Sequence, residues 1–177
     1  DGYVITNTIA GDNQSEWLLR LSCDGRTADL YCCQRLIRLE AGRPVMHNPL
    51  RYPLDQLLMM LLLAEQEGVL VHAAAMDGTG QGLVMAGPSG AGKSTLARRL
   101  SKNLEWRMLT DDRALIKQVN GQYQVYGTPW AGEGQWADPA GARLQAVCLL
   151  QKGKENSLRQ LSPSVGAKQL LPVLSIP

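Results

Sequence analysis

The residues of this chain whose types and spacing point most directly to chemistry lie between positions 87 and 95. The sequence there, Gly-Pro-Ser-Gly-Ala-Gly-Lys-Ser-Thr, contains the pattern Gly-x-x-x-x-Gly-Lys-Ser and follows an apolar segment. Glycines let successive backbone N–H groups turn toward phosphate oxygens, and a helix that follows directs its positive end at the same anion. The pattern therefore predicts that this loop binds a nucleotide polyphosphate. The predicted nucleotide-binding residues are Gly87, Pro88, Ser89, Gly90, Ala91, Gly92, Lys93, Ser94 and Thr95.

Three side chains of this loop have separate expected roles. Lys93 would reach the β and γ phosphates, and the Ser94 hydroxyl would hold Mg²⁺. Thr95 lies one residue further into the predicted helix, near the inner phosphates. We therefore expect ATP and Mg²⁺ as the ligands of this segment.

Two adjacent aspartates, Asp111 and Asp112, follow the apolar segment 106–110 and are the next candidates for chemistry. Open α/β sheets bind ligands at the carboxyl ends of their strands, and we expect the strand 106–110 to lie beside the strand that leads into the loop. Phosphoryl transfer needs a base near the acceptor hydroxyl and oxygen ligands for a metal ion, and neighbouring carboxylates can divide these roles. The alternative is that Asp-Asp-Arg caps a strand in solvent.

His72 and Arg143 are two further candidates. His72 lies in the apolar segment 69–75, which should pair with the strand before the loop, so its imidazole can approach the aspartates and assist proton movement. Arg143 begins a later strand and could supply positive charge to a transferred phosphoryl group. A buried core histidine and a surface arginine are the respective alternatives. The segment 127–141 is rich in glycine and proline and is predicted to be a loop near the site.

The elements that must position these residues follow from apolar patterns and turn signals. Residues 1–53 are expected to form a β-rich portion, and residues 54–177 a core that carries the site. The expected fold is α/β, with a mixed sheet and an antiparallel hairpin beside the phosphate loop; an Asn-Gly pair at 120–121 predicts a second hairpin. The expected strands are 2–9, 17–22, 28–33, 36–39, 69–75, 82–86, 106–110, 113–119, 122–126, 143–150 and 157–161, and the expected helices are 54–66, 93–102 and 164–171.

Composition and charge argue against several classes of partner. The 18 basic and 16 acidic residues give a net charge of +2, which is too small to favour nucleic acid or an anionic membrane. The longest apolar run, residues 57–64, is shorter than the ~20 residues that span a bilayer. The four cysteines form no Cys-x-x-Cys pair and have no histidines nearby, which argues against zinc and for reduced thiols. We expect a cytoplasmic protein.

These motifs together resemble the catalytic core of the HPr kinase/phosphorylase family, which shares its fold with phosphoenolpyruvate carboxykinase. The resemblance rests on Val71-His72-Ala73-Ala74, the hairpin, the loop 87–95 and the segment from Leu109 to Arg113. It covers residues 69–126 and implies a P-loop kinase fold. It also implies a homo-oligomer, because HPr kinases assemble as hexamers.

The same resemblance implies roles for the site residues. Asp111 matches the general base that acts on a protein serine, and His72 matches the histidine that assists it. Ser94 matches the loop serine that binds magnesium. Asp112, as the carboxylate adjacent to the base, is the second expected magnesium ligand. Lys93 and Arg143 complete the expected catalytic set.

Two departures indicate a divergent member of that family. HPr kinases usually have Ser-Glu after the loop lysine, whereas this chain has Ser94-Thr95. The signature rich in glycine and isoleucine that follows the Asp pair in HPr kinases is replaced by Gly127-Thr128-Pro129-Trp130. Some divergent relatives accompany peptide-modification gene clusters and phosphorylate other hydroxyl acceptors.

The expected function is therefore the transfer of a phosphoryl group from ATP, with Mg²⁺, to a serine-type hydroxyl of a peptide or protein. One alternative is a small-molecule kinase of the shikimate or nucleoside type. Such kinases usually have a lid that bears arginine, and no arginine occurs here between Arg113 and Arg143. The other alternative is a regulatory module that binds ATP and transfers nothing.

Overall fold

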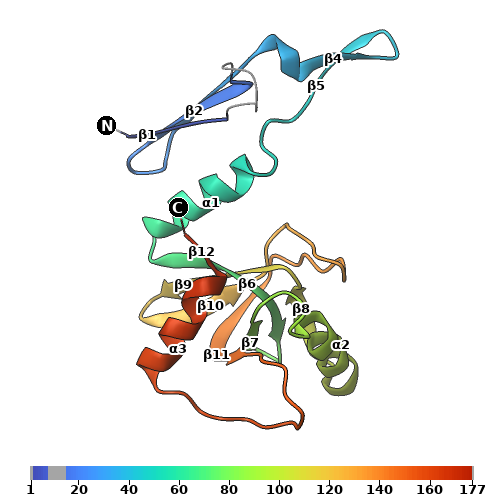
Figure 1. The fold of residues 1–177 in the computed structure, drawn as a ribbon. Helices are drawn as coiled ribbons and strands as arrows, with labels where there is room; N and C mark the ends of the chain where they lie inside the picture. Colours follow the sequence, from blue (N-terminus) through green and yellow to red (C-terminus); the bar gives the residue numbers. More distant parts are fainter. Residues whose placement is uncertain (1, 8–14, 177) are drawn as a thin grey trace. The chain divides into compact units, whose positions relative to one another are not determined.

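The computed structural model describes residues 2–7 and 15–176, and its contacts divide the chain into two compact units (Figure 1). The first unit runs from Asp1 to Glu65 and the second from Gln66 to Pro177. Each unit has its own core. The predicted α/β class, with a mixed sheet and a β-rich N-terminal portion, is confirmed.

The first unit is built from strands and one helix. Strands β1 to β3 form an antiparallel sheet, and β2 buries alternate residues, which are Trp17, Leu19 and Leu21. Trp17 and Leu19 share a small core with Leu54 of helix α1, which explains why the contacts group α1 with these strands. The elements are β1 (Gly2–Thr6), β2 (Trp17–Ser22), β3 (Ala28–Cys32), η1 (Gln34–Leu36), β4 (Ile37–Glu40), β5 (Arg43–Met46) and α1 (Leu54–Ala64).

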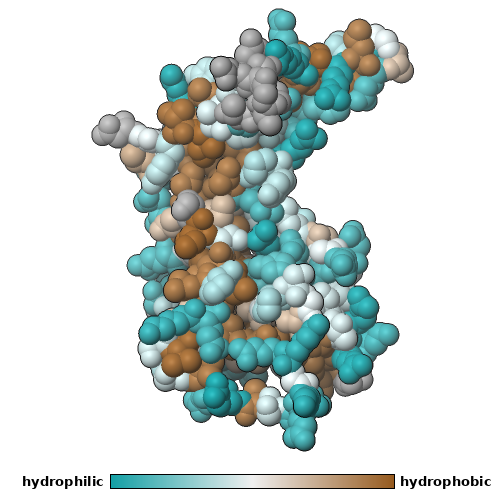
Figure 2. All heavy atoms as spheres, in the orientation of Figure 1, coloured by the Kyte–Doolittle hydropathy of each residue, from teal (hydrophilic) through white to brown (hydrophobic). Residues whose placement is uncertain are grey.

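Strand β5 was not predicted, and part of the predicted strand 2–9 falls outside the described residues. Helix α1 ends at Ala64, two residues before the predicted end. Strands β4 and β5 form a separate two-stranded sheet whose residues are all exposed, Ile37 and Leu39 among them. Hydrophobic and hydrophilic residues lie side by side on the surface of this hairpin (Figure 2). Within the described part of the chain, no helix is long and apolar enough to cross a membrane.

The second unit carries the predicted site. Its elements are β6 (Gly68–Asp77), β7 (Gln81–Ala86), α2 (Lys93–Leu104), β8 (Arg107–Thr110), β9 (Arg113–Val119), β10 (Gln122–Tyr126), β11 (Gly141–Leu149), α3 (Pro163–Leu170), η2 (Leu171–Val173) and β12 (Leu174–Ser175). Both predicted hairpins are confirmed, because β6 pairs with β7 and β9 pairs with β10 in antiparallel register. The predicted strand 157–161 is wrong, since residues 150–162 form no regular element.

Strand β6 organises the sheet because it is long enough to pair with several strands. One edge of β6 pairs with β7 at residues 73–77 and with the short strand β12 at residues 70–71. The other edge pairs with β9 at residues 68–72 and with β8 at residues 75–77. We predicted that the strand ending at Asp111 would lie beside the strand that leads into the loop. That prediction is wrong, because β6 lies between β8 and β7.

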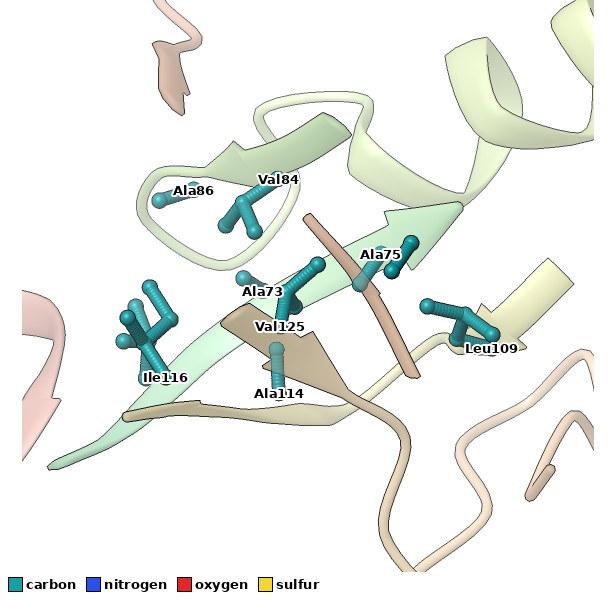
Figure 3. Packing of buried hydrophobic residues seen from close by; sticks show 10 residues of the cluster. Ala73, Ala75, Val84, Ala86, Leu109, Ala114, Ile116 and Val125 are labelled. Carbon is teal, nitrogen blue, oxygen red and sulfur yellow. The ribbon is translucent and has the colours of Figure 1, made fainter. Parts of the chain in front are cut away.

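The strand pairings also close into a ring. Strand β7 pairs in parallel with β11, β11 pairs with β10, β10 pairs with β9, and β9 returns to β6. The interior of this small barrel is filled by the largest core cluster, in which alanines are prominent (Figure 3). Ala73 and Ala75 of β6 face Val84, Ala86, Ala114 and Val125 of neighbouring strands there. Small side chains are needed because five strands enclose little space.

A second cluster packs helix α2 against the barrel. Ala97 of α2 is fully buried among Ala74, Met76 and Met85, which point outward from β6 and β7. Leu100 packs against the same cluster. This packing fixes the start of α2 at the end of β7, which is where the phosphate loop lies.

Candidate functional site

The loop between β7 and α2 has the backbone geometry that the sequence predicts for it. Gly92 precedes the first residue of α2 and has a φ of 100°, in the left-handed region that favours glycine. Gly87 approaches the chain closely, since a Cβ atom there would lie 2.9 Å from the carbonyl oxygen of Leu150. Within the described ranges, no side chain caps the start of α2. The first N–H groups of this helix are therefore directed at the space in front of the loop.

The side chain of Lys93 lies inside the loop. It is buried, and its Nζ donates hydrogen bonds to the carbonyl oxygens of Gly87 at 2.9 Å and Pro88 at 3.1 Å. Burial lowers the pKa of Lys93, and the negative charge of Asp112 opposes that shift. Ser94 and Thr95 follow in the first turn of α2, with Ser94 half-buried and Thr95 exposed.

Asp112 faces the same region from the other side of β6. His72 of β6 pairs in register with Arg113 of β9, and this register places the His72 Nδ1 atom 3.3 Å from the Asp112 Oδ1 atom. The Arg113 Nε atom lies 3.8 Å from Asp112 Oδ2. Burial lowers the pKa of His72, the positive charge of Lys93 lowers it further, and Asp112 opposes both effects. His72 is therefore neutral near pH 7.

Asp111 points away from this group and is almost completely buried, with an exposed fraction of 5%. Its Oδ1 atom accepts a hydrogen bond from the backbone N–H of Gly132 at 2.8 Å, and its Oδ2 atom accepts one from the backbone N–H of Gly134. We predicted that His72 would approach the Asp pair, and the structure brings it to Asp112. Asp111 instead holds the loop that follows β10.

That loop, residues 127–141 (orange in Figure 1), is attached to the strands of the site at several further points. The Thr128 hydroxyl donates a hydrogen bond to the carbonyl oxygen of Arg113 at 2.7 Å. Asp138 forms an ion pair with Arg107, and its N–H donates to the carbonyl oxygen of Leu109 at 2.8 Å. The guanidinium of Arg98 in α2 lies 5.7 Å from the centre of the Trp136 ring. The predicted position of this loop near the site is confirmed.

Arg143 is the predicted site residue that the structure does not bring to the others. It lies opposite Gln81 at the start of β11, whereas the phosphate loop follows Ala86, which lies opposite Leu149. The physical reason is the direction of the strands. Because β11 runs parallel to β7, the first residues of β11 lie at the end of the sheet remote from the loop.

Arg113 occupies the position that we had expected of Arg143. Besides its contact with Asp112, its Nη1 atom donates a hydrogen bond to the Ser175 Oγ atom at 2.8 Å. Its Nε atom is buried and has no hydrogen-bond partner among the residues that the structure describes. Arg113 directly follows the Asp pair in the sequence, and this adjacency is the signal that could have identified it. No local signal indicated Ser175, because strand β12 was not predicted.

A surface pocket of about 420 Å³ adjoins the phosphate loop and this cluster. Its lining includes His72, Arg113 and Ser175 together with Pro88 and Ser89 of the loop. The remaining wall is formed by Pro172, Val173 and Leu174. The pocket therefore joins the loop to a cationic group and an apolar wall.

The protein oxygen atoms of the site can hold Mg²⁺ only together with the phosphate oxygens of a bound nucleotide. Mg²⁺ is usually held by one or two protein oxygens together with phosphate oxygens and water. Ser94 and Asp112 can supply oxygens of that kind. Among the described residues, no group of three or more His, Cys, Asp and Glu side chains could hold a metal ion alone.

Comparison with known proteins identifies one family. The model of the family described as SynChlorMet cassette protein ScmC matches residues 53–173. No curated protein matches the chain. Among solved structures, the Hpr(Ser) kinase/phosphatase from Coxiella burnetii is similar, with 18% sequence identity and a TM-score of 0.38. That similarity covers 54% of this chain and 66% of the other, so the match spans just under two thirds of the Coxiella chain.

Proposed function

The chain belongs to the SynChlorMet cassette protein ScmC family, and we propose that it is a kinase that transfers a phosphoryl group from ATP to a serine-type hydroxyl of a peptide or protein. We also assign its second unit to the P-loop fold of HPr kinase and phosphoenolpyruvate carboxykinase. One observation carries the proposal. The buried Lys93 of a glycine-rich loop lies near a carboxylate, Asp112, whose two oxygens are flanked by a histidine and an arginine.

The loop and helix α2 provide the nucleotide site. The ammonium of Lys93 now bonds two carbonyl oxygens of its own loop, and β and γ phosphates would replace these neutral acceptors with charged ones. Ser94 would hold Mg²⁺, which when bound neutralises part of the phosphate charge. The positive end of α2 acts in the same direction.

Asp112 is the carboxylate that we assign to proton transfer, in place of Asp111. Both oxygens of Asp111 accept backbone N–H groups and the residue is only 5% exposed, so an acceptor hydroxyl has little access to that side chain. The Asp112 side chain is 30% exposed, and His72 and Arg113 flank its two oxygens. Asp112 can therefore accept the proton of the acceptor hydroxyl, while the metal role predicted for it passes to Ser94 and the phosphates.

Arg113 and Lys93 supply positive charge where the transferred phosphoryl group would develop negative charge. This arrangement suits phosphoryl transfer, in which catalysis rests mainly on positioning and electrostatic stabilisation. Arg113 thereby takes the role that we predicted for Arg143. Asp111 is a positioning residue, which keeps the loop 127–141 against the site.

A matched pair of variants tests this assignment, with Lys93→Ala as the reference for lost nucleotide binding. Labelled ATP and Mg²⁺ would be incubated with a panel of serine-containing peptides and small hydroxyl compounds, and nucleotide affinity would be measured separately. Asp112→Asn should keep nucleotide affinity and reduce transfer by about 10²- to 10⁴-fold, the usual contribution of a general base. Asp111→Asn should reduce transfer less and should also lower the melting temperature.

Each contrary result has a distinct meaning. If Asp112→Asn transfers phosphoryl groups at the full rate and a normally folded Asp111→Asn protein does not, then Asp111 is the general base. Labelling of small hydroxyl compounds but of no peptide would indicate a small-molecule kinase. Tight ATP binding without labelling of any acceptor would indicate a regulatory module.

A further inference from the structure

The C-terminal strand β12 brings a serine hydroxyl into the candidate site. Strand β12 contains only Leu174 and Ser175, and it pairs with β6 opposite Val71 and Leu70. Val71 immediately precedes His72 in β6. The Ser175 hydroxyl oxygen accepts a hydrogen bond from Arg113 at 2.8 Å.

Ser175 shares its surroundings with the residues assigned to phosphoryl transfer. It lines the same pocket as His72, Arg113 and the loop residue Ser89. Arg113 contacts Ser175 through Nη1 and Asp112 through Nε, so a single guanidinium separates the two side chains. The Ser175 Oγ and Asp112 Oδ2 atoms therefore lie within about 9 Å of one another, since a guanidinium is a rigid planar group.

Two features make this serine suited to react. Its oxygen accepts the Arg113 N–H group, which leaves its own O–H proton available for transfer. A two-residue strand contributes few hydrogen bonds to the sheet, so Ser175 can shift toward the loop without unfolding the barrel. Leu174 and Ser175 are each half-buried, and the neighbouring Ile176 is exposed.

We propose that Ser175 is itself a phosphoryl acceptor, so that the chain phosphorylates its own C-terminal strand; the proposal rests on the kinase function proposed above. The Ser175 oxygen forms a bond to the γ phosphorus of ATP. The bond between that phosphorus and the oxygen bridging to the β phosphate breaks, and its electron pair leaves with ADP. The hydroxyl proton passes to the Asp112 carboxylate.

After transfer, the phosphate group on Ser175 would be stabilised by the guanidinium of Arg113. A phosphoserine carries close to two negative charges at neutral pH and binds arginine through charge-assisted hydrogen bonds. Arg113 already contacts the Ser175 oxygen and has a buried Nε atom without a hydrogen-bond partner. The phosphate would thus supply an acceptor for a guanidinium whose donors are incompletely used.

The test uses the full chain with ATP and Mg²⁺, followed by intact mass measurement and mapping of the modified residue. The unaltered protein should gain one phosphoryl group at Ser175, at a rate constant that does not change with protein concentration. Ser175→Ala should fall to the level of Lys93→Ala, whereas Ser175→Thr, which keeps a hydroxyl, should retain modification. Ser157→Ala is the matched control, because Ser157 is an exposed serine of the segment 150–162, and it should behave as the unaltered protein.

Nucleotide binding, measured in parallel, separates the failure of this proposal from the failure of the proposed function. If the protein binds ATP and phosphorylates an added acceptor but Ser175 stays unmodified, the self-phosphorylation proposal alone is overturned. Undiminished self-labelling of Ser175→Ala would overturn it as well. If the protein binds no ATP, both proposals are overturned.

Discussion

At the scale of single residues, the pKa of His72 shows most clearly how the surroundings of a side chain alter its chemistry. It is partly buried and lies near Lys93 and Arg113, and among the described residues Asp112 is its one close negative neighbour. Burial, together with the positive charges of Lys93 and Arg113, outweighs the carboxylate, so the pKa of His72 falls below its ordinary value of 6.5. The folded protein therefore favours neutral His72 more than the unfolded chain does.

This shift predicts a dependence of stability on pH. The pKa of His72 is lower in the folded state than in the unfolded chain. The contribution of His72 to the stability of the fold is therefore fully present above about pH 6.5, and it is lost as the pH falls through the lowered pKa. Thermal unfolding of the unaltered protein and of His72→Asn should be compared at about pH 7.5 and about pH 5.5. The melting temperature of the unaltered protein should fall more on acidification. Equal falls in the two proteins would show that His72 does not titrate in this way.

At the scale of elements, the loop 127–141 depends on two glycines that bring its backbone to Asp111. At Gly134, a Cβ atom would lie 2.2 Å from the Trp136 ring and 2.8 Å from Asp111 Oδ2. An alanine there must move the loop, and it would deprive the buried carboxylate of a donor. Asp111 thus adds a side-chain attachment between the loop and the end of β8 to those that Asp138 makes with Arg107 and Leu109.

Gly134→Ala should therefore lower the free energy of unfolding by about 1–3 kcal/mol, the usual effect of leaving a buried polar group unsatisfied. It should also reduce phosphoryl transfer, because the loop is attached to Arg113 through Thr128. The control is Gly166→Ala in α3, where a Cβ atom would meet nothing within 4 Å and where alanine should stabilise the helix by about 0.5–1 kcal/mol. Denaturant titration measures both changes. A neutral Gly134→Ala would contradict the proposed attachment.

At the scale of the whole molecule, the second unit is a barrel whose interior admits only small side chains. Ala75 has no exposed surface and lies in the cluster that fills the ring of strands. A larger side chain there would have to displace its neighbours, because Ala75 is held between Val84 of β7 and Thr110 of β8. Overfilled cores lose stability through displaced side chains and backbone.

Ala75→Leu should accordingly lower the free energy of unfolding by about 1–3 kcal/mol or more. Gln122→Leu introduces the same side chain at an exposed position of β10 and should change stability by no more than about 0.5 kcal/mol. Denaturant unfolding monitored by tryptophan fluorescence compares the two. A fully stable Ala75→Leu would mean that the interior of the barrel has unused space.

The features that could be predicted from the sequence are those that depend on residues close together in the chain. The hairpins, α1, α2 and the loop 87–95 depend on apolar periodicity, Asn-Gly and glycine spacing, which are local signals, and they were predicted within a few residues. The neighbour of β8, the closure of the ring and strand β12 depend on pairings between distant residues. No pattern within a single segment specifies such pairings.

For the site, the sequence correctly placed His72 near one aspartate, Asp112, and the loop 127–141 near the other, Asp111. It could not decide between the two aspartates, because the two N–H groups that bind Asp111 lie 21 and 23 residues further along the chain. Arg143 was misplaced because the parallel pairing of β11 with β7 was not predicted.

The opposite directions of Asp111 and Asp112 have a consequence for chemical labelling. Two identical functional groups, one residue apart, differ in access to solvent: the Asp111 residue is 5% exposed and the Asp112 side chain 30%. A water-soluble carbodiimide with an amine should therefore couple to Asp112 and leave Asp111 intact. Both aspartates lie in one tryptic peptide, so the ratio of the two adducts would show whether the loop 127–141 covers Asp111 in solution.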